Sequence, residues 1–256
     1  MKKPTPKIKP TKAPTKNKEQ NKSEGLRINK YLALHGYSTR RGADDLISKN
    51  QIFINGRRAV LGDKVTDKDK VELRGGQVKK EFRYFAYNKP YGVITHSPQF
   101  GQKDIAKDLS GNFNMKGVFP IGRLDKSSTG LMILTDDGRV TDRLLNPKHS
   151  HEKEYLVTTK LKLRNNFKEK MEAGVNIEGY KTEKCKVKII DDFTFRVTLT
   201  EGKKHQIRRM CSALFNDVDT LKRERIMNVT LGDLPSGHFR QLQGEELKTF
   251  LSSIGL

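Results

Sequence analysis

The sequence predicts an α+β protein with a small basic N-terminal domain and a larger domain built on a mostly antiparallel mixed sheet flanked by helices. After residue 81 the predicted strands outnumber the predicted helices and do not alternate strictly with them, which excludes a doubly wound parallel fold. Lys and Arg total 51 against 30 Asp and Glu, and the surplus is densest before residue 81. A formal charge of +21 indicates a polyanionic partner, of which nucleic acid is the first candidate.

Residues 1–24 are predicted to form a disordered basic arm. They hold eight Lys and two Glu with almost no large aliphatic side chain, so they bury too little apolar surface to offset the entropy of ordering. A transit peptide for an organelle is the alternative interpretation of this segment. Such peptides are rich in Arg, whereas the first Arg of this chain is Arg27, so the composition disfavours that alternative. The arm is therefore either a loose electrostatic contact to phosphates or a solubilising tail.

Residues 25–80 predict two helices followed by short strands, an ααβ unit. Apolar side chains recur at helical spacing over 26–34, and Gly36 stands where that helix would end. Either Ser38 or Thr39 can cap the second helix, because a short hydroxyl side chain accepts a hydrogen bond from the first free amides.

A basic hairpin completes this unit. A strand over 52–54 leads into Asn55-Gly56, the strongest short hairpin signal. Taken in order, the signals over 27–75 resemble the S4 RNA-binding domain. The resemblance implies that one face meets an RNA backbone. The basic residues of this face would be Arg27, Lys30, Arg40, Arg41, Arg57 and Arg58.

The region 81–256 carries a lower density of positive charge and predicts the larger domain. Runs rich in β-branched and aromatic residues predict strands over 82–87, 92–95, 131–135, 155–159, 186–190 and 193–199. Helical spacing appears over 139–145, 166–173, 205–215 and 245–251.

Three motifs in this region carry candidate chemistry. Gly-Arg-Leu-Asp at 122–125 places Asp125 on a polar loop before an apolar strand, where it either performs chemistry or caps a turn. Lys153 and Tyr155 share one face of a strand, and the tyrosine either stacks on a base or lies in the core. In His-Gln-Ile-Arg-Arg-Met at 205–210, Arg208 can hold a carboxylate, while Arg209 fits a solvated face that touches phosphates.

Together and in this order, the motifs resemble those of the pseudouridine synthases that carry an S4 domain and modify ribosomal RNA. The resemblance implies that a uridine is flipped from its stack and isomerised, with its base rejoined to the ribose through C5. Asp125 would act on the ribose, attacking C1′ or taking a proton from C2′, and Arg208 would pair with it. Tyr155 would stack under the uracil, and Arg123 would enter the gap left by the flipped base.

The implied reaction needs no cofactor and no metal, and the six His form no helical metal-binding pair. Two cysteines, Cys185 and Cys211, and no apolar segment near Met1 predict a cytoplasmic protein without a membrane span. We expect a monomer that binds ribosomal RNA, 23S rRNA before tRNA, and not DNA. The alternative is a non-catalytic RNA-binding factor for ribosome assembly.

Overall fold

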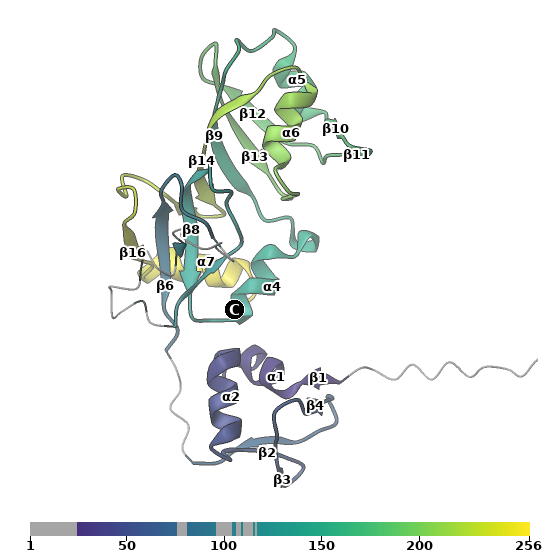
Figure 1. Ribbon diagram of the computed structural model, residues 1–256, viewed down its shortest axis with the longest axis vertical. Helices are drawn as coiled ribbons and strands as arrows, with labels where there is room; N and C mark the ends of the chain where they lie inside the picture. Colours follow the sequence, from purple (N-terminus) through teal and green to yellow (C-terminus); the bar gives the residue numbers. More distant parts are fainter. Residues whose placement is uncertain (1–24, 76–80, 96–103, 106–108, 110–114, 116) are drawn as a thin grey trace, which may run out of the picture.

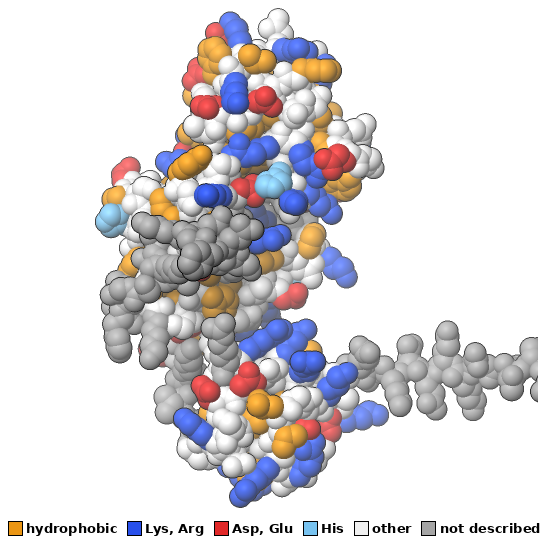
Figure 2. Space-filling view, in the orientation of Figure 1, with side chains coloured by type: hydrophobic (Ala, Val, Ile, Leu, Met, Phe, Trp, Pro, Cys, Tyr) orange, Lys and Arg blue, Asp and Glu red, His pale blue; other side chains and the backbone are white. Residues whose placement is uncertain are grey.

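The computed structural model describes residues 25–256 except 76–80, 96–103, 106–108, 110–114 and 116. The predicted basic arm over 1–24 lies outside the described residues. Figure 1 shows a small N-terminal domain beside one end of a larger domain that is built on a long sheet. Lys and Arg side chains are spread over the small domain and along the middle of the larger one (Figure 2).

The N-terminal domain packs two helices against short strands, as the sequence predicts. Thr39 caps the second helix, because its Oγ1 accepts a hydrogen bond of 3.0 Å from the amide of Gly42. Asn55 and Gly56 have φ values of 50° and 84°, as a type I′ hairpin requires. The elements are β1 (Leu26–Arg27), α1 (Ile28–Leu34), α2 (Arg40–Ser48), β2 (Ile52–Ile54), β3 (Arg57–Arg58), β4 (Lys64–Val65) and β5 (Val71–Leu73).

The larger domain is built on a nine-stranded mixed sheet in which only β8 and β14 run parallel. Its main path is β12-β13-β9-β14-β8-β6-β16, with β7 paired to β8 and β15 paired to β14. These strands are β6 (Tyr84–Lys89), β7 (Phe119–Ile121), β8 (Thr129–Thr135), β9 (Lys153–Thr159), β12 (Lys186–Ile189), β13 (Thr194–Leu199), β14 (Val218–Ile226), β15 (Val229–Thr230) and β16 (Phe239–Gln241). The fold class is therefore α+β, as predicted.

Helices cover the two ends of this sheet separately, and each group closes its own core (Figure 1). The pair α5 (Phe167–Glu172) and α6 (Gln206–Ala213) lies beside β12 and β13, together with the hairpin of β10 (Asn176–Ile177) and β11 (Tyr180–Lys181). At the other end, α4 (Arg139–Leu145) and α7 (Gly244–Ser253) lie beside β8 and β6, and η2 (Pro147–His149) follows α4. The two halves meet where β14 runs beside β8.

The predicted elements of the larger domain differ from the structure mainly at 92–95 and at β14, and the short strands β7, β10, β11, β15 and β16 were not predicted either. The predicted strand over 92–95 is wrong: only an isolated bridge joins Ile94 to Asp104 there. The nine-residue strand β14 was not predicted, because its sequence, VDTLKRERI, is dense in charge and does not alternate regularly. It nevertheless lies in the middle of the sheet, between β9 and β8.

Candidate active site

A short loop between β7 and β8 presents Asp125, and neighbouring groups hold its backbone in place. All five backbone carbonyls from residue 124 to residue 128 accept a hydrogen bond within the protein. In that order the donors are the hydroxyl of Thr95 (2.8 Å), the amide of Ser128 (3.0 Å), the amide of Gly92 (2.9 Å), Nη2 of Arg208 (3.2 Å) and Nζ of Lys89 (2.7 Å). The carboxylate therefore extends from a fixed backbone, which is what positioned chemistry requires.

The Asp125 carboxylate remains accessible while its loop is fixed. Its side chain is 35% exposed, and Oδ2 lies 2.9 Å from Nδ1 of His205. His205 precedes α6 with φ of 51°, a left-handed conformation that ends the preceding turn. A half-exposed carboxylate beside an exposed imidazole can meet a ligand without further opening of the fold.

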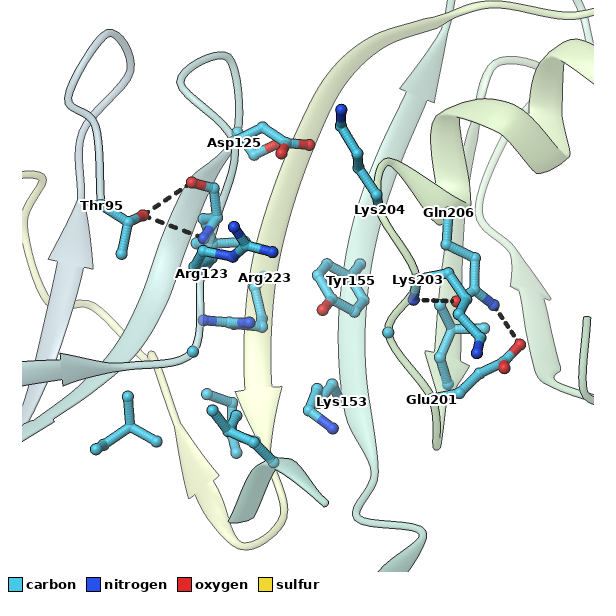
Figure 3. Close-up of a pocket in the computed structure, with 18 of the residues that line it drawn as sticks. Thr95, Arg123, Asp125, Lys153, Tyr155, Glu201, Lys203, Lys204, Gln206 and Arg223 are labelled. Atoms are coloured by element: carbon cyan, nitrogen blue, oxygen red, sulfur yellow. Dashed lines mark hydrogen bonds between the residues drawn. The ribbon is translucent and has the colours of Figure 1, made fainter. Parts of the chain in front are cut away.

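An open cavity of about 890 Å³ lies next to this carboxylate, between the two halves of the domain. Figure 3 shows Arg123, Arg223, Tyr155 and Lys153 on one side of it and the turn from Lys203 to Gln206 on the other. Tyr155 is half-buried, and the guanidinium carbon of Arg223 lies 6.0 Å from the centre of its ring. The exposed face of the tyrosine is the right shape for a flat ring to stack on.

Cations outnumber carboxylates in the lining of the cavity, which includes Arg123, Lys126, Lys153, Lys203, Lys204 and Arg223 but only Asp125 and Glu201. Burial lowers the pKa of Lys89 to about 8, with a smaller contribution from the charge of Arg223, while Asp125 acts in the opposite direction. Burial and the same arginine also lower the pKa of Lys153, whose Nζ donates to the carbonyl of His151. A site of this kind favours an electron-rich, polyanionic ligand.

The turn across the cavity is organised by a buried carboxylate. Glu201 accepts hydrogen bonds from the hydroxyl of Tyr180, the amide of Glu183 and the side chain of Gln206, the first residue of α6. Hydrogen bonding to Glu201 raises the pKa of Tyr180 to about 12. The carboxylate thus fixes the start of α6, directly after His205, beside the cavity.

Within the described residues we find no group of His, Cys, Asp and Glu side chains able to hold a metal ion. The helices of the described residues also lack the combination of length and apolar character that spanning a bilayer requires.

Comparisons with known proteins agree with this geometry. A model of the RNA pseudouridylate synthase family matches residues 83–213, and an S4 domain model matches residues 26–71. The dual-specificity RNA pseudouridine synthase RluF of Escherichia coli strain K12 is 42% identical over 87% of this chain and 77% of its own length. The chain belongs to the RNA pseudouridine synthase family. It is an isomerase with an N-terminal S4 domain.

Two further proteins align with most of this chain and with most of their own length. The ribosomal large subunit pseudouridine synthase B of Bacillus subtilis strain 168 is 33% identical over 87% of this chain and 94% of its own length. The crystal structure of a pseudouridylate synthase superposes with a TM-score of 0.65 at 30% identity, covering 90% of this chain and 99% of that one.

Arg123, Lys153 and Tyr155 line the same cavity as Asp125, but the two predicted arginines of α6 do not. No ion pair joins Arg208 to Asp125 among the described residues. Instead Arg208 donates to the carbonyls of Ser127 (3.2 Å) and Val218 (3.3 Å), because its helix places it beside the loop backbone. Arg209 is not a freely solvated cation either: it forms an ion pair of 2.5 Å with Glu178 of the β10–β11 hairpin.

The predicted basic residues of the S4 domain lie on its surface. Arg27, Lys30, Arg40 and Arg58 are exposed, and α2 contains Arg41, whose side chain lies outside what the structure describes. Arg57 is also exposed, but it forms an ion pair of 2.8 Å with Asp63. That contact lowers the pKa of Asp63 through the hydrogen bond from Arg57 and already neutralises part of the arginine's charge.

Sequence reasoning missed three side chains that shape the site: Thr95, Lys89 and Arg223. Thr95 both donates to the carbonyl of Leu124 and accepts from its amide. Lys89 and Arg223 are charged residues inside strands, at positions where the sheet requires burial. A lone cation at the end of an apolar strand is a sequence signal that could have found Lys89, whereas the charge-dense run around Arg223 gives no such signal.

Proposed function

We propose that this RNA pseudouridine synthase isomerises a uridine in 23S ribosomal RNA, with Asp125 as the catalytic group. The observation that carries the proposal is the half-exposed carboxylate on a loop whose five carbonyls are all bonded, at the mouth of a basic cavity. The name of the large-subunit relative from Bacillus subtilis supports ribosomal RNA as the substrate class. The S4-like domain over 25–80 would hold the RNA, and residues 81–256 would perform the reaction.

The reaction requires a base that has left its stack. The target uridine flips into the cavity and lies against Tyr155, while Arg123 fills the space that the base vacates. Asp125 then acts at C1′ or C2′ of the ribose. The N1–C1′ bond breaks, the uracil turns, a C5–C1′ bond forms, and the C5 proton leaves while N1 gains one. Atoms and charge balance without an oxidant or a transferred group, so the proposed reaction needs no cofactor.

The remaining side chains have supporting roles in this proposal. Arg208 acts as a positioning residue, since it holds the carbonyl two residues after Asp125. Lys153 lies two residues before Tyr155 on the same face of β9 and would add positive charge beside the RNA backbone. We place the reaction in the cytoplasm and expect a monomer.

The first experiment measures tritium release from RNA labelled at uracil C5, using 23S rRNA fragments and bulk tRNA. Wild type should release tritium from a 23S fragment, whereas Asp125→Asn should lose at least about 10³-fold in rate and keep its RNA affinity, since only the reacting carboxylate is changed. Asp233→Asn, which alters an exposed carboxylate away from the cavity, should react like wild type.

The substrate arms and the affinity measurement decide between the alternatives. Release from tRNA alone would move the substrate class to tRNA, and release from both would match the two specificities in the name of the Escherichia coli relative. Tight binding without release from any RNA would overturn catalysis and leave a binding factor. A parallel loss of affinity and rate in Asp125→Asn would assign that residue to binding.

A further inference from the structure

A row of paired residues crosses the sheet directly below the loop of Asp125. Lys89 on β6 is opposite Gly130 on β8, Gly130 is opposite Arg223 on β14, and Arg223 is opposite Tyr155 on β9. Directly paired residues point to the same face of a sheet. Because Gly130 has no side chain, the backbone of β14 approaches β8 closely at Arg223, and the arginine side chain can reach the backbone of β8.

Arg223 carries an unused hydrogen-bond donor at this point of the sheet. Arg223 is only 4% exposed, and its Nε donates a hydrogen bond of 2.7 Å to the carbonyl of Leu131. Its Nη2 is buried and has no hydrogen-bond partner among the described residues, although the side chain lines the cavity. Arg225, two residues further along β14, uses its guanidinium on Glu152 and on the carbonyl of Met227. A buried charged donor without an acceptor is costly, so an acceptor is expected to arrive with the ligand.

The position of Arg223 suggests which part of the nucleotide supplies that acceptor. The guanidinium lies on the floor of the cavity beside Tyr155, where Figure 3 shows it well below Asp125. Exposed cations at the rim, among them Arg123, Lys126 and Lys204, are better placed for phosphates. With the ribose at Asp125 and the base stacked on Tyr155, the floor meets the edge of the base that is farthest from N1. On a uracil, the acceptor on that far side is O4.

We propose that Arg223 is a further substrate-contacting residue that donates a hydrogen bond to O4 of the flipped uracil. The proposal rests on the function proposed above and assigns Arg223 to the recognition of the base. Cytosine carries an amino group in place of O4, so its donor would face the donor of Arg223 and leave both unpaired. The contact would therefore select uridine against cytidine.

The same contact suits both orientations of the base during the reaction. A half-turn of uracil about its N3–C6 axis exchanges N1 with C5 and O2 with O4. After the turn, O2 takes the place that O4 had, and Arg223 again faces a carbonyl oxygen. One fixed donor can thus hold the base before and after it rotates, as expected of a preorganised site.

The test is a double-mutant cycle between the arginine and single atoms of the base. RNA affinity is measured in the Asp125→Asn background, so that no base rotates, with a 23S stem-loop that wild type converts. The target position carries uridine, 4-thiouridine, 2-thiouridine or cytidine. Sulfur is a poor acceptor, so 4-thiouridine and cytidine should each weaken binding about 10-fold when Arg223 is present and less than about 2-fold in Arg223→Gln. Replacement by 2-thiouridine should have the same effect in both proteins.

Matched variants separate contact from folding. Arg225→Gln removes a guanidinium from the same strand outside the cavity and should keep the full 4-thiouridine effect. Arg223→Lys keeps the charge, so it should fold and retain part of the effect, and thermal unfolding checks both Arg223 variants. An equal 4-thiouridine penalty with and without Arg223, or coupling to 2-thiouridine alone, would overturn the assignment. Failure of the proposed function would show separately, as no tritium release by wild type.

Discussion

Lys89 is a fully buried cation whose amine holds the loop of Asp125, the carboxylate proposed to be catalytic. Its Nζ donates to the carbonyls of Ser128 (2.7 Å) and Pro90 (2.9 Å). Burial lowers its pKa from 10.5 to about 8. In the unfolded chain the amine keeps the higher pKa, so between pH 8 and 10.5 the unfolded state binds more protons than the folded state. Stability contributed by this group therefore rises with pH across that window.

Lys89→Met should remove this pH dependence. A pKa difference of about 2.5 units corresponds to about 3 kcal/mol, so the wild-type free energy of unfolding should gain up to that amount, relative to the variant, between pH 8 and 10.5. Urea unfolding at several pH values measures the difference. Lys148→Met, at an exposed lysine, should follow wild type across the window. Parallel curves for wild type and Lys89→Met would show that Lys89 keeps its ordinary protonation when folded.

Individual residues also show where sequence reasoning stops. Asp125, Lys153 and Tyr155 could be placed together because motifs fix them on a loop and on one face of a strand. The sequence could not predict that Asp125 contacts His205 rather than Arg208. This contact depends on the left-handed conformation of His205, directly before α6. Both side chains belong to the same six-residue motif, and only the path of the backbone decides which one reaches the carboxylate.

At the scale of elements, β14 joins the two halves of the larger domain, and its contact with β8 depends on a glycine. A Cβ on Gly130 would lie 2.3 Å from the carbonyl oxygen of Arg223 and 2.7 Å from its amide nitrogen. The φ of Gly130 is also positive, at 100°, which disfavours any other residue. The strand pair that carries Arg223 thus requires glycine for two separate reasons.

Gly130→Ala should destabilise the protein by about 3 kcal/mol or more, because the clash with β14 backbone adds to the cost of positive φ. Gly179→Ala is the matched control, since Gly179 also has positive φ, at 79°, but its Cβ would meet no atom within 4 Å. It should cost only about 1–2 kcal/mol. Chemical denaturation measures both. Equal losses in the two variants would show that the conformation of the glycine matters and the close approach of the strands does not.

Most of the fold could be predicted from local patterns, and the central strand shows why the rest could not. The helix α2 follows its cap and helical spacing, α4, α5, α6 and α7 follow helical spacing alone, and the hairpin of β2 and β3 follows Asn55-Gly56. In β14, Lys222, Arg223 and Arg225 conceal the strand, because their burial is compensated by contacts from other elements. Arg223 uses Leu131 of β8, and Arg225 uses Glu152. Such compensation appears only once distant segments have come together.

At the scale of the whole molecule, charge is concentrated where RNA is expected to bind. Residues 25–80 carry 13 basic and six acidic side chains, a far higher density of positive charge than residues 81–256, with 30 and 22. The end of α1 also lies near the start of α4, since a Cβ on Gly36 would be 3.5 Å from Nη1 of Arg139. Arg139 is itself fixed by Asp137 and lies over the ring of Phe82. RNA held on the S4 domain would therefore be presented from a defined side.

Replacing both Arg40 and Arg41 of α2 with Ala should weaken RNA binding and flatten its dependence on salt. Each phosphate contact that is lost should lower the slope of log K against log salt by about 0.7 to 0.9, so the pair should lower it by about 1.5. Affinity for a 23S fragment, measured between about 50 and 200 mM salt, gives the slope, and kcat should change little because the cavity is intact. A double variant at Arg164 and Lys168, exposed cations of the larger domain outside the cavity, is the matched control. An unchanged slope in the Arg40 and Arg41 variant would mean that these residues neutralise no phosphate, and the RNA-binding surface would have to be sought on the larger domain.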